Sequence, residues 1–350
     1  MSTREDSIPH ELRTAAEPRQ NKLYPVRISQ IDQVNPSIRL LRLALPPGGD
    51  QTDEGEIKLI SRGYLDQADP NPEQFTFLPG QWLDVFIPSI SHAGGFTITS
   101  TPADAHLLPS PEPPTESLSI EEEDLPPVRS TGRTPYVELA VQNAPSNPAA
   151  AWLWRPKEEI LGKELNVRVG GSFIWPPAGF NTKDIRNVVF IAGGVGINPL
   201  ISILSHLKND DTATLSPGTE VHFLYSTRLP PSKSVSNFQA ALDQILFLSR
   251  IREIIHSHAP SRRLRISLDL FLTNLNEYPD LKISTPQDMK IHDRRITAED
   301  LKTAVTGSSG DETGTGTVCY ICGPPPMTDE LADKLKGMVG SERVSYEKWW

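Results

Sequence analysis

Short stretches in which hydrophobic and polar residues alternate fill the first half of the chain. This alternation is typical of β-strands with one buried face. The predicted strands cover residues 22–45 (with a turn at Asn35-Pro36), 82–87, 136–142, 164–169 and 172–175. One short helix is predicted from Pro148, because Asn147 can cap it and proline suits a first helical position. Up to residue 182 we therefore expect a small antiparallel β-barrel.

From residue 184 onward, segments with the spacing of strands alternate with segments that have the spacing of helices. Strands are predicted at residues 188–192, 221–225, 264–272 and 318–322. Helices are predicted at residues 199–208, 235–258, after a capping-box sequence at 297–300, and at 329–338. This order predicts a doubly wound parallel sheet with a ligand crevice at the carboxyl ends of its strands. The expected fold class is therefore α+β with two domains.

A length of 350 residues allows two domains, which we place at residues 22–182 and 183–350. Residues 46–74 and 104–134 are rich in proline and acidic residues, and we expect flexible insertions there. Residues 1–21 are expected to form a disordered arm.

Charge and hydropathy exclude several classes of partner. The formal net charge is −10 and no basic stripe is present, so nucleic acid is not expected as a partner. No window approaches the roughly 18 consecutive apolar residues of a membrane span. The first twenty residues include four acidic residues and no apolar core, unlike a secretory signal or a transit peptide. We expect a cytoplasmic protein.

Only two cysteines occur, Cys319 and Cys322. This number excludes a disulfide framework and a four-cysteine iron–sulfur or zinc site made by this chain alone. In thioredoxin-like redox pairs the CxxC spacing opens a helix. Here it lies in the apolar run 318–322, typical of a strand whose alternate residues point to opposite faces. We therefore do not expect a redox dithiol.

A glycine-rich turn follows the apolar run at 188–192. The turn consists of Gly193, Gly194, Val195 and Gly196. Glycines let a ligand approach the backbone closely, and the helix that follows offers free N–H groups to an anion such as a nucleotide diphosphate. The third glycine of the dinucleotide fingerprint is replaced by Pro199, and Asn198 can cap the helix. An ordinary strand-to-helix turn is the alternative.

Three motifs give the chain a family resemblance over residues 22–350. They are GGVGINPL at 193–200, YICGPPPMTD at 320–329 and EKWW at 347–350. With the strand-rich first half, they resemble the ferredoxin-NADP reductase superfamily and, within it, the branch of oxidoreductase NAD-binding-domain-containing proteins. The resemblance implies an FAD-binding β-barrel joined to an NAD(P)-binding α/β domain. It also implies transfer of hydride from NADH or NADPH to FAD, and of electrons to a separate acceptor, which could be a protein, a quinone or a small molecule.

The resemblance assigns the flavin to the segment at residues 94–100. Phe96 would pack on the flavin, and the hydroxyls of Thr97 and Ser100 would lie at its N5 edge. The family's arginine for the diphosphate is replaced by Gly94, so the start of the helix at Asn147 and Ala149 would carry more of the phosphate contact. The alternative is that residues 94–100 are an ordinary strand that begins at a glycine turn and has no role in flavin binding.

The resemblance also assigns the nicotinamide end. Cys322 would lie beside the nicotinamide C4, and the turn after it would let the cofactor approach; this turn contains Gly323, Pro324, Pro325 and Met327. At the tail, Glu347 matches the family's carboxylate, while Trp349 and Trp350 would cover the flavin face. Thr97, Cys322 and Glu347 are the implied catalytic residues. A buried core cysteine, and a tail that packs on its own domain, are the alternatives.

The second strand of the α/β half ends at Ser226 and Arg228, which could receive a 2′-phosphate. No acidic group for a ribose diol stands there, so the choice between NADH and NADPH stays open. Gly94 also keeps two other functions open. One is a nucleotide-binding regulatory protein without tight flavin, and the other is a flavin reductase that uses free flavin as a substrate.

Overall fold

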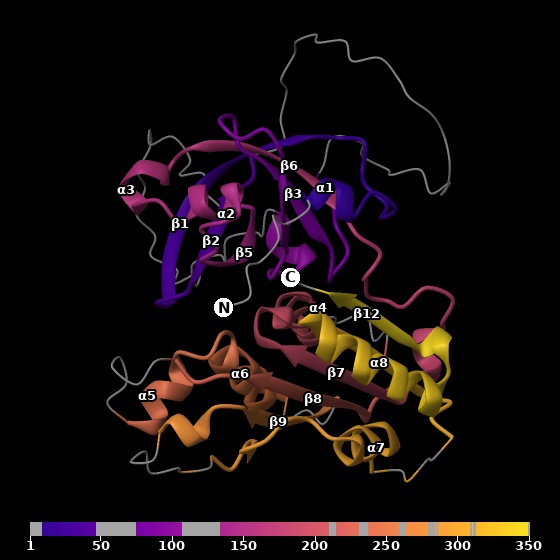
Figure 1. Cartoon of the computed structure of the whole chain (residues 1–350). Coiled ribbons are helices and arrows are strands. Elements are labelled where there is room, and N and C mark those ends of the chain that lie inside the picture. Colours follow the sequence, from indigo (N-terminus) through magenta and orange to yellow (C-terminus); the bar gives the residue numbers. More distant parts are fainter. Residues whose placement is uncertain are drawn as a thin grey trace, which may run out of the picture.

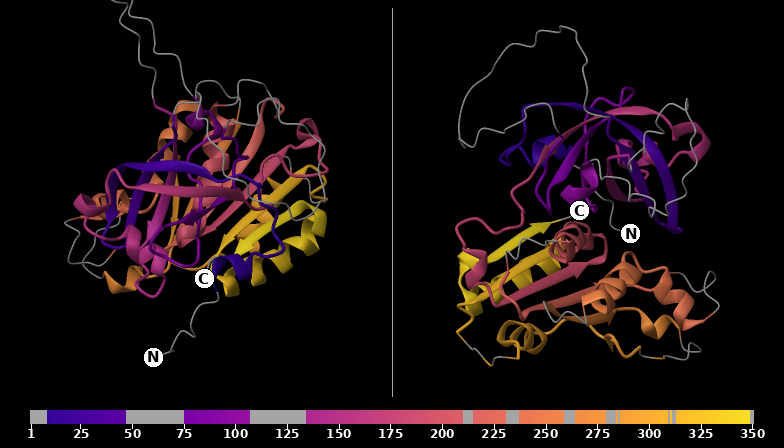
Figure 2. Two further views of the ribbon diagram at one scale, coloured as in Figure 1. Left: turned by 90° about the horizontal axis from the view of Figure 1, so that it is seen from above. Right: turned by 180° about the vertical axis from the view of Figure 1, so that it is seen from behind.

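The computed structural model describes residues 9–46, 75–106, 134–209, 215–230, 237–258, 264–278, 284, 286–308, 310 and 313–348. Figure 1 shows two β-sheets, one above the other, with helix α4 (Ile197–Asn209) between them. The view from behind in Figure 2 shows the same arrangement.

The first sheet is antiparallel and has six strands in the order β4-β3-β6-β1-β2-β5. The strands are β1 (Tyr24–Asn35), β2 (Ile38–Ala44), β3 (Trp82–Phe86), β4 (Gly94–Thr97), β5 (Tyr136–Gln142) and β6 (Glu164–Gly170). Just after β4, Ile98 forms a single bridge with Leu139 of β5. The predicted barrel is therefore a curled sheet whose two edges meet at one point rather than along a full ladder.

Three short helices accompany this sheet: α1 (His10–Arg13), α2 (Pro148–Leu153) and α3 (Lys157–Ile160). The cap predicted for α2 is confirmed, because Asn147 Oδ1 accepts hydrogen bonds from the N–H groups of Ala149 and Ala150. Pro148 occupies the first position of that helix, where its missing N–H costs nothing.

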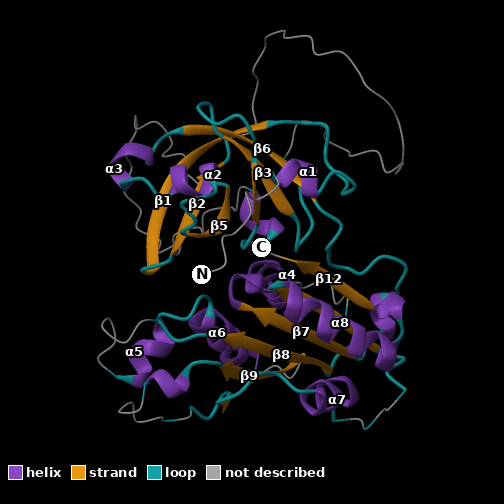
Figure 3. Cartoon of the chain, viewed as in Figure 1, coloured by secondary structure: helices purple, strands orange, loops and turns teal. Residues whose placement is uncertain are grey.

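The second sheet is parallel, with strand order β10-β9-β8-β7-β11-β12. Its strands are β7 (Asn187–Gly193), β8 (Thr219–Thr227), β9 (Leu264–Leu272), β10 (Lys290–His292), β11 (Thr317–Gly323) and β12 (Val344–Lys348). The other helices are α5 (Phe238–Asp243), α6 (Leu248–His258), α7 (Ala298–Thr306) and α8 (Pro325–Val339). One hydrophobic cluster joins α4, α5 and α6 to one face of the sheet, and another joins α7 and α8 to the opposite face (Figure 3). The predicted doubly covered sheet is confirmed.

Two predicted elements are wrong. Residues 172–175 form no strand, because this segment leaves the first sheet and packs the rings of Phe173 and Trp175 near Tyr320 of β11. The predicted helix over 235–258 is interrupted between α5 and α6, where Phe247 has a φ of 58°. Residues 245–248 are all buried hydrophobics, and four consecutive residues of one continuous helix cannot all face the same side. Residues 235 and 236 lie outside the described residues.

Strands β10 and β12 were not predicted either. Of the two expected insertions, residues 47–74 and 107–133 lie outside the described residues. Residues 102–105, at the start of the second insertion, form a short 3₁₀ helix with a Thr101–Asp104 capping box.

Residues 9–21 lie against the first sheet, so the expected disordered arm is wrong for this part. His10 is buried, and its imidazole packs edge-on against Trp82 with ring centroids 4.6 Å apart. Arg19 Nε lies 2.9 Å from Asp84 Oδ2, and Arg168 of β6 also contacts this fully buried carboxylate, at 2.8 Å. We call residues 9–20 the N-terminal strap.

The N-terminal strap should weaken as the pH falls. The pKa of His10 is lowered to about 4, chiefly by burial and to a smaller extent by the charges of Arg13 and Arg19, while Asp84 opposes the shift. The unfolded chain, with a His10 pKa near 6.5, binds more protons in this window. The stabilisation is therefore complete above pH 6.5 and is lost as the pH falls toward 4. The expected loss is about 3 kcal/mol in the free energy of unfolding.

Urea denaturation at pH 7.5 and pH 5 should show about 2 kcal/mol of this loss, because pH 5 is still above the folded pKa. Hydrogen exchange of residues 9–20 locates it. A His10→Gln variant serves as the control, because glutamine does not titrate. It should lose less stability than the wild type over the same interval. Equal losses for the two proteins contradict the assignment to His10.

Candidate functional site

The carboxyl ends of three neighbouring parallel strands form the candidate nucleotide site. Cys322 of β11 is the register partner of Ala192 in β7 on one side and of Glu347 in β12 on the other. The glycine turn after β7 is therefore adjacent to the turn after β11. Figure 1 shows β12 ending between the two sheets, so this edge of the parallel sheet faces the antiparallel one.

Close packing between these two turns explains three of their glycines. A Cβ on Gly196 would lie 2.1 Å from the carbonyl oxygen of Cys322. One on Gly193 would lie 2.7 Å from Pro324 Cδ and 2.8 Å from Met327 Cε, and one on Gly323 would lie 2.8 Å from Met327 Cε. Protein atoms, rather than a ligand, thus account for the absence of a side chain at these positions.

Gly194 differs from the other glycines of the turn. Its φ is +55°, and no atom lies within 4 Å of the place that a Cβ would take. Gly194, Val195 and Gly196 form a 3₁₀ turn that leads directly into α4, whose first N–H groups have no partner within the helix. Of the glycines predicted to admit a ligand, Gly194 alone presents an open side.

Helix α4 connects the glycine turn to the antiparallel sheet. The predicted cap role of Asn198 is wrong: the helix already begins at Ile197, and Asn198 Nδ2 donates a hydrogen bond to the Ala140 carbonyl of β5 at 3.1 Å. One turn later, Ser202 Oγ donates to the Ser100 carbonyl at 2.7 Å. Helix α4 is therefore hydrogen-bonded to two backbone carbonyls of the antiparallel sheet, one on each side of the point where the β4 and β5 edges meet. Pro199 lies in the first turn of α4, as predicted.

The residues assigned to the flavin ring differ in what their side chains do. Phe96 belongs to the hydrophobic core of the antiparallel sheet. Ser100 Oγ accepts a hydrogen bond from the N–H of Glu138 at 3.0 Å, so its hydroxyl is already bonded to β5 of the sheet. Thr97 is buried, and its Oγ1 has no hydrogen-bond partner among the described residues. A buried hydroxyl without a partner is uncommon, which leaves Thr97 as the residue of this segment that can bind a ligand.

The described residues do not reproduce the family's diphosphate contacts on the flavin side. A Cβ on Gly94 would lie 2.5 Å from the Cβ of Ala149, so the place of the family's arginine is filled by α2. The N–H groups of Ala149 and Ala150 donate to Asn147 Oδ1 at 3.1 and 3.2 Å. The donors expected to bind phosphate are therefore already used by the cap.

Both cysteines are fully buried, on opposite faces of β11. Cys319 packs in the cluster that contains α7 and α8, whereas Cys322 packs in the cluster that contains α4. The strand interpretation of the CxxC sequence is thereby confirmed. Burial raises the pKa of the Cys319 thiol to about 12.

Neither cysteine should react in the native state. We expect less than about one tenth of the two thiols to be labelled by a maleimide within an hour at pH 7.5, because thiolates are the reactive form and both sulfurs are shielded. Labelling in 8 M urea should reach both thiols. Mass spectrometry of native and denatured samples measures this difference, and rapid native labelling of either cysteine contradicts the burial.

The carboxyl end of β8, where the sequence places Ser226 and Arg228, contains a residue that sequence reasoning missed. Ser226 is half-buried near the end of β8, and Arg228 follows it with an exposed side chain. Arg228 forms an ion pair with Glu277, which lies after β9. No local pattern could have revealed this acidic group, because the partners are 49 residues apart.

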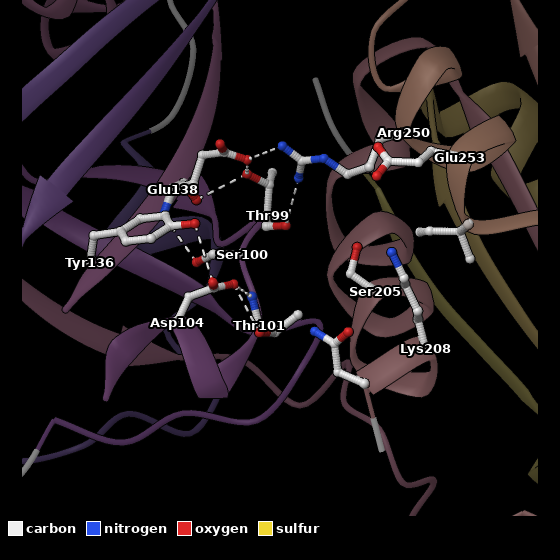
Figure 4. A pocket seen from close by; sticks show the side chains of 12 residues that line it. Thr99, Ser100, Thr101, Asp104, Tyr136, Glu138, Ser205, Lys208, Arg250 and Glu253 are labelled. Carbon is white, nitrogen blue, oxygen red and sulfur yellow. Dashed lines mark hydrogen bonds and ion pairs between the residues drawn. The ribbon is translucent and has the colours of Figure 1, made fainter. Parts of the chain in front are cut away.

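A polar cavity of about 230 Å³ lies between the two sheets, beside the second half of α4. Figure 4 shows Glu138 of β5 and Arg250 of α6 facing each other there. Glu138 is buried, and its Oε1 lies 2.8 Å from Arg250 Nη2 and 3.0 Å from Thr99 Oγ1. Ser100 is the one predicted site residue that lines this cavity. The ion pair joins β5 of the antiparallel sheet to α6, which packs on the parallel sheet, and sequence reasoning missed it.

The remaining predicted residues are placed only in part. Glu347 is half-buried in β12, and Pro325 begins α8, while Trp349 and Trp350 lie outside the described residues. Within the described ranges, no cluster of three or more potential metal ligands occurs. No helix in that part of the chain is long and apolar enough to cross a membrane.

Comparisons with solved structures agree with this fold. The CS-b5R domains of human Ncb5or (NAD⁺ form) match 93% of this chain and 69% of their own, with a TM-score of 0.56 at 15% identity. A ferredoxin NADP⁺ reductase from Neisseria gonorrhoeae with bound FAD and NADP matches 95% of this chain and 100% of its own, with a TM-score of 0.54 at 13% identity. At this identity the likeness concerns the fold alone.

Sequence comparisons identify the family. Residues 185–335 match the family described as ferric reductase NAD binding domain. Oxidoreductase NAD-binding domain-containing protein 1 from Bos taurus is 33% identical over 284 residues, covering 79% of this chain and 73% of that protein. The protein of the same name from Danio rerio is 28% identical and covers 97% of both chains. The chain therefore belongs to the family of oxidoreductase NAD-binding domain-containing protein 1.

Proposed function

We propose that the protein is an NAD(P)H-dependent flavin oxidoreductase that passes hydride to FAD and electrons to a separate acceptor. The observation that carries the proposal is the direct attachment of α4 to the antiparallel sheet. The helix that begins at the glycine turn donates a hydrogen bond, through Ser202, to Ser100, three residues after Thr97. The hydrogen bond from α4 to Ser100 would thus fix the position of a nucleotide at the turn relative to a flavin at Thr97.

The chain's own residues would bind and orient the reactants. The open side of Gly194 and the first N–H groups of α4 suit the nucleotide diphosphate. Thr97 Oγ1 would hydrogen-bond the flavin ring, and Glu347 would lie at the nicotinamide end, beside Cys322. The fully buried Cys322 side chain would support the turn from within. Bound flavin supplies the hydride-accepting ring.

A flavin reductase that binds FAD or FMN as a dissociable substrate is the second candidate. It is favoured by the packing of Ala149 against Gly94 and by the use of the first α2 amides as partners of Asn147. Together these leave the ADP half of FAD without its family contacts among the described residues. Thr97 would still hydrogen-bond the flavin ring, so binding would depend on the ring rather than on the ADP half.

Anaerobic titration of the purified protein with NADH or NADPH tests both candidates. Flavin absorbance near about 450 nm that bleaches on addition of nucleotide supports the first candidate. Colourless protein that oxidises nucleotide only when free flavin is added supports the second. A protein that oxidises no nucleotide with either flavin contradicts both and leaves a nucleotide-binding regulatory role. Thr97→Val is the matched variant, because it removes the hydroxyl and keeps the shape.

A further inference from the structure

We infer that Glu277 makes the nucleotide site prefer NADH over NADPH by holding the guanidinium of Arg228. The inference rests on the proposed function, since it assumes that a nicotinamide nucleotide binds at the glycine turn. It names the residue that decides between the two cofactors, a choice that the sequence left open.

The position of Arg228 brings it to the ribose end of such a nucleotide. Gly193, at the start of the glycine turn, is the register partner of Ser226 in β8. Arg228 comes two residues later, at the same carboxyl edge of the parallel sheet. In sheets of this kind the strand next to the glycine turn ends near the adenosine ribose, where an acidic residue accepts from the diol or an arginine binds a 2′-phosphate.

Here the cation and the acidic group stand together. Arg228 Nη2 lies 2.5 Å from Glu277 Oε1, and the two side chains are 67% and 51% exposed. A dianionic 2′-phosphate would have to displace the carboxylate from the guanidinium and would then lie beside its negative charge. A 2′,3′-diol has no charge and can donate a hydrogen bond to the carboxylate.

The loop that contains Glu277 is fixed to the end of β8, so this ion pair is more than a chance surface contact. The buried Asn274 accepts from the N–H of Leu229 at 2.8 Å and donates to its carbonyl at 3.2 Å. Its Nδ2 also lies 3.4 Å from Glu277 Oε2. Tyr278 donates from its hydroxyl to the carbonyl of Pro230. These contacts hold the carboxylate in front of Arg228.

Equilibrium binding of NADH and NADPH, followed by nucleotide fluorescence, tests the inference without relying on turnover. The wild type should bind NADH at least about tenfold more tightly than NADPH. Glu277→Gln removes the charge and keeps a hydrogen-bonding group. It should tighten NADPH roughly tenfold and leave NADH within about threefold. The gain should shrink in 0.5 M NaCl, because an exposed charge contact is screened.

Two further variants complete the experiment. The double variant Glu277→Gln/Arg228→Ala should lose the gain for NADPH, because the released guanidinium is what binds the phosphate. Glu164→Gln removes another exposed arginine partner, on the antiparallel sheet, and should change neither affinity. A wild type that prefers NADPH, or an unchanged affinity ratio in Glu277→Gln, overturns the inference while leaving the proposed function intact. A wild type that binds neither nucleotide overturns both.

Discussion

Replacing Gly196 with alanine is expected to lower the free energy of unfolding by about 3 kcal/mol and to abolish nucleotide binding. The new Cβ would lie 2.1 Å from the Cys322 carbonyl oxygen and 2.7 Å from Gly323 Cα. Both are backbone atoms of buried residues, so no flexible side chain can move aside. The two turns must separate, and the groups that would contact the nucleotide separate with them.

Urea denaturation and a fluorescence titration with NADH measure the two effects. Gly337→Ala is the matched control, since Gly337 lies within α8 and no atom lies within 4 Å of its Cβ position. Alanine there should raise the free energy of unfolding by about 0.5–1 kcal/mol through better helix propensity. A Gly196→Ala protein as stable as the wild type contradicts the close packing of the turns.

Replacing Arg250 with alanine is expected to cost about 3 kcal/mol of unfolding free energy. The variant leaves the Glu138 carboxylate buried between the sheets, with Arg42 Nε at 3.7 Å as its remaining ion-pair partner. Burying a carboxylate that has lost its main partner is far more costly than losing an exposed pair. Arg27→Ala, which breaks the exposed pair with Glu164, should cost less than about 1 kcal/mol.

A double-mutant cycle separates the ion pair from simple loss of packing. Glu138→Gln removes the buried charge, so the double variant Glu138→Gln/Arg250→Ala should be more stable than the sum of the two single losses predicts. Urea denaturation of the four proteins gives the coupling energy. Strictly additive losses contradict a direct interaction between the two side chains.

The local sequence pattern was sufficient to predict strands and helix caps wherever a residue's environment depends on its neighbours in the sequence. The strand prediction at 136–142 matches β5 at both ends, and that at 264–272 matches β9. The cap at Asn147 and the capping box at 297–300 also follow from nearby residues: Thr297 and Asp300 exchange the predicted hydrogen bonds at the start of α7. Alternation within the CxxC run predicted the opposite faces of its two cysteines.

Features that depend on distant residues could not be predicted in the same way. The apolar run at 172–175 resembles a strand, but Tyr320 determines where its rings pack. The glycines of the turn were assigned to a ligand, whereas the atoms that require most of them belong to Cys322, Pro324 and Met327. Likewise, nothing near Glu138 or Glu277 indicates that an arginine lies opposite. Such pairings follow from the topology of the fold rather than from local sequence.

The two hydrogen bonds from α4 also determine which parts of the molecule can move. Helix α4 cannot rotate away from Ser100 or Ala140 without breaking its hydrogen bonds to these two residues, which lie on either side of the point where the edges of the antiparallel sheet meet. The junction between the sheets therefore acts as a fixed joint rather than a hinge. Under the proposed function, nucleotide would then enter and leave without a hinge motion between the two sheets.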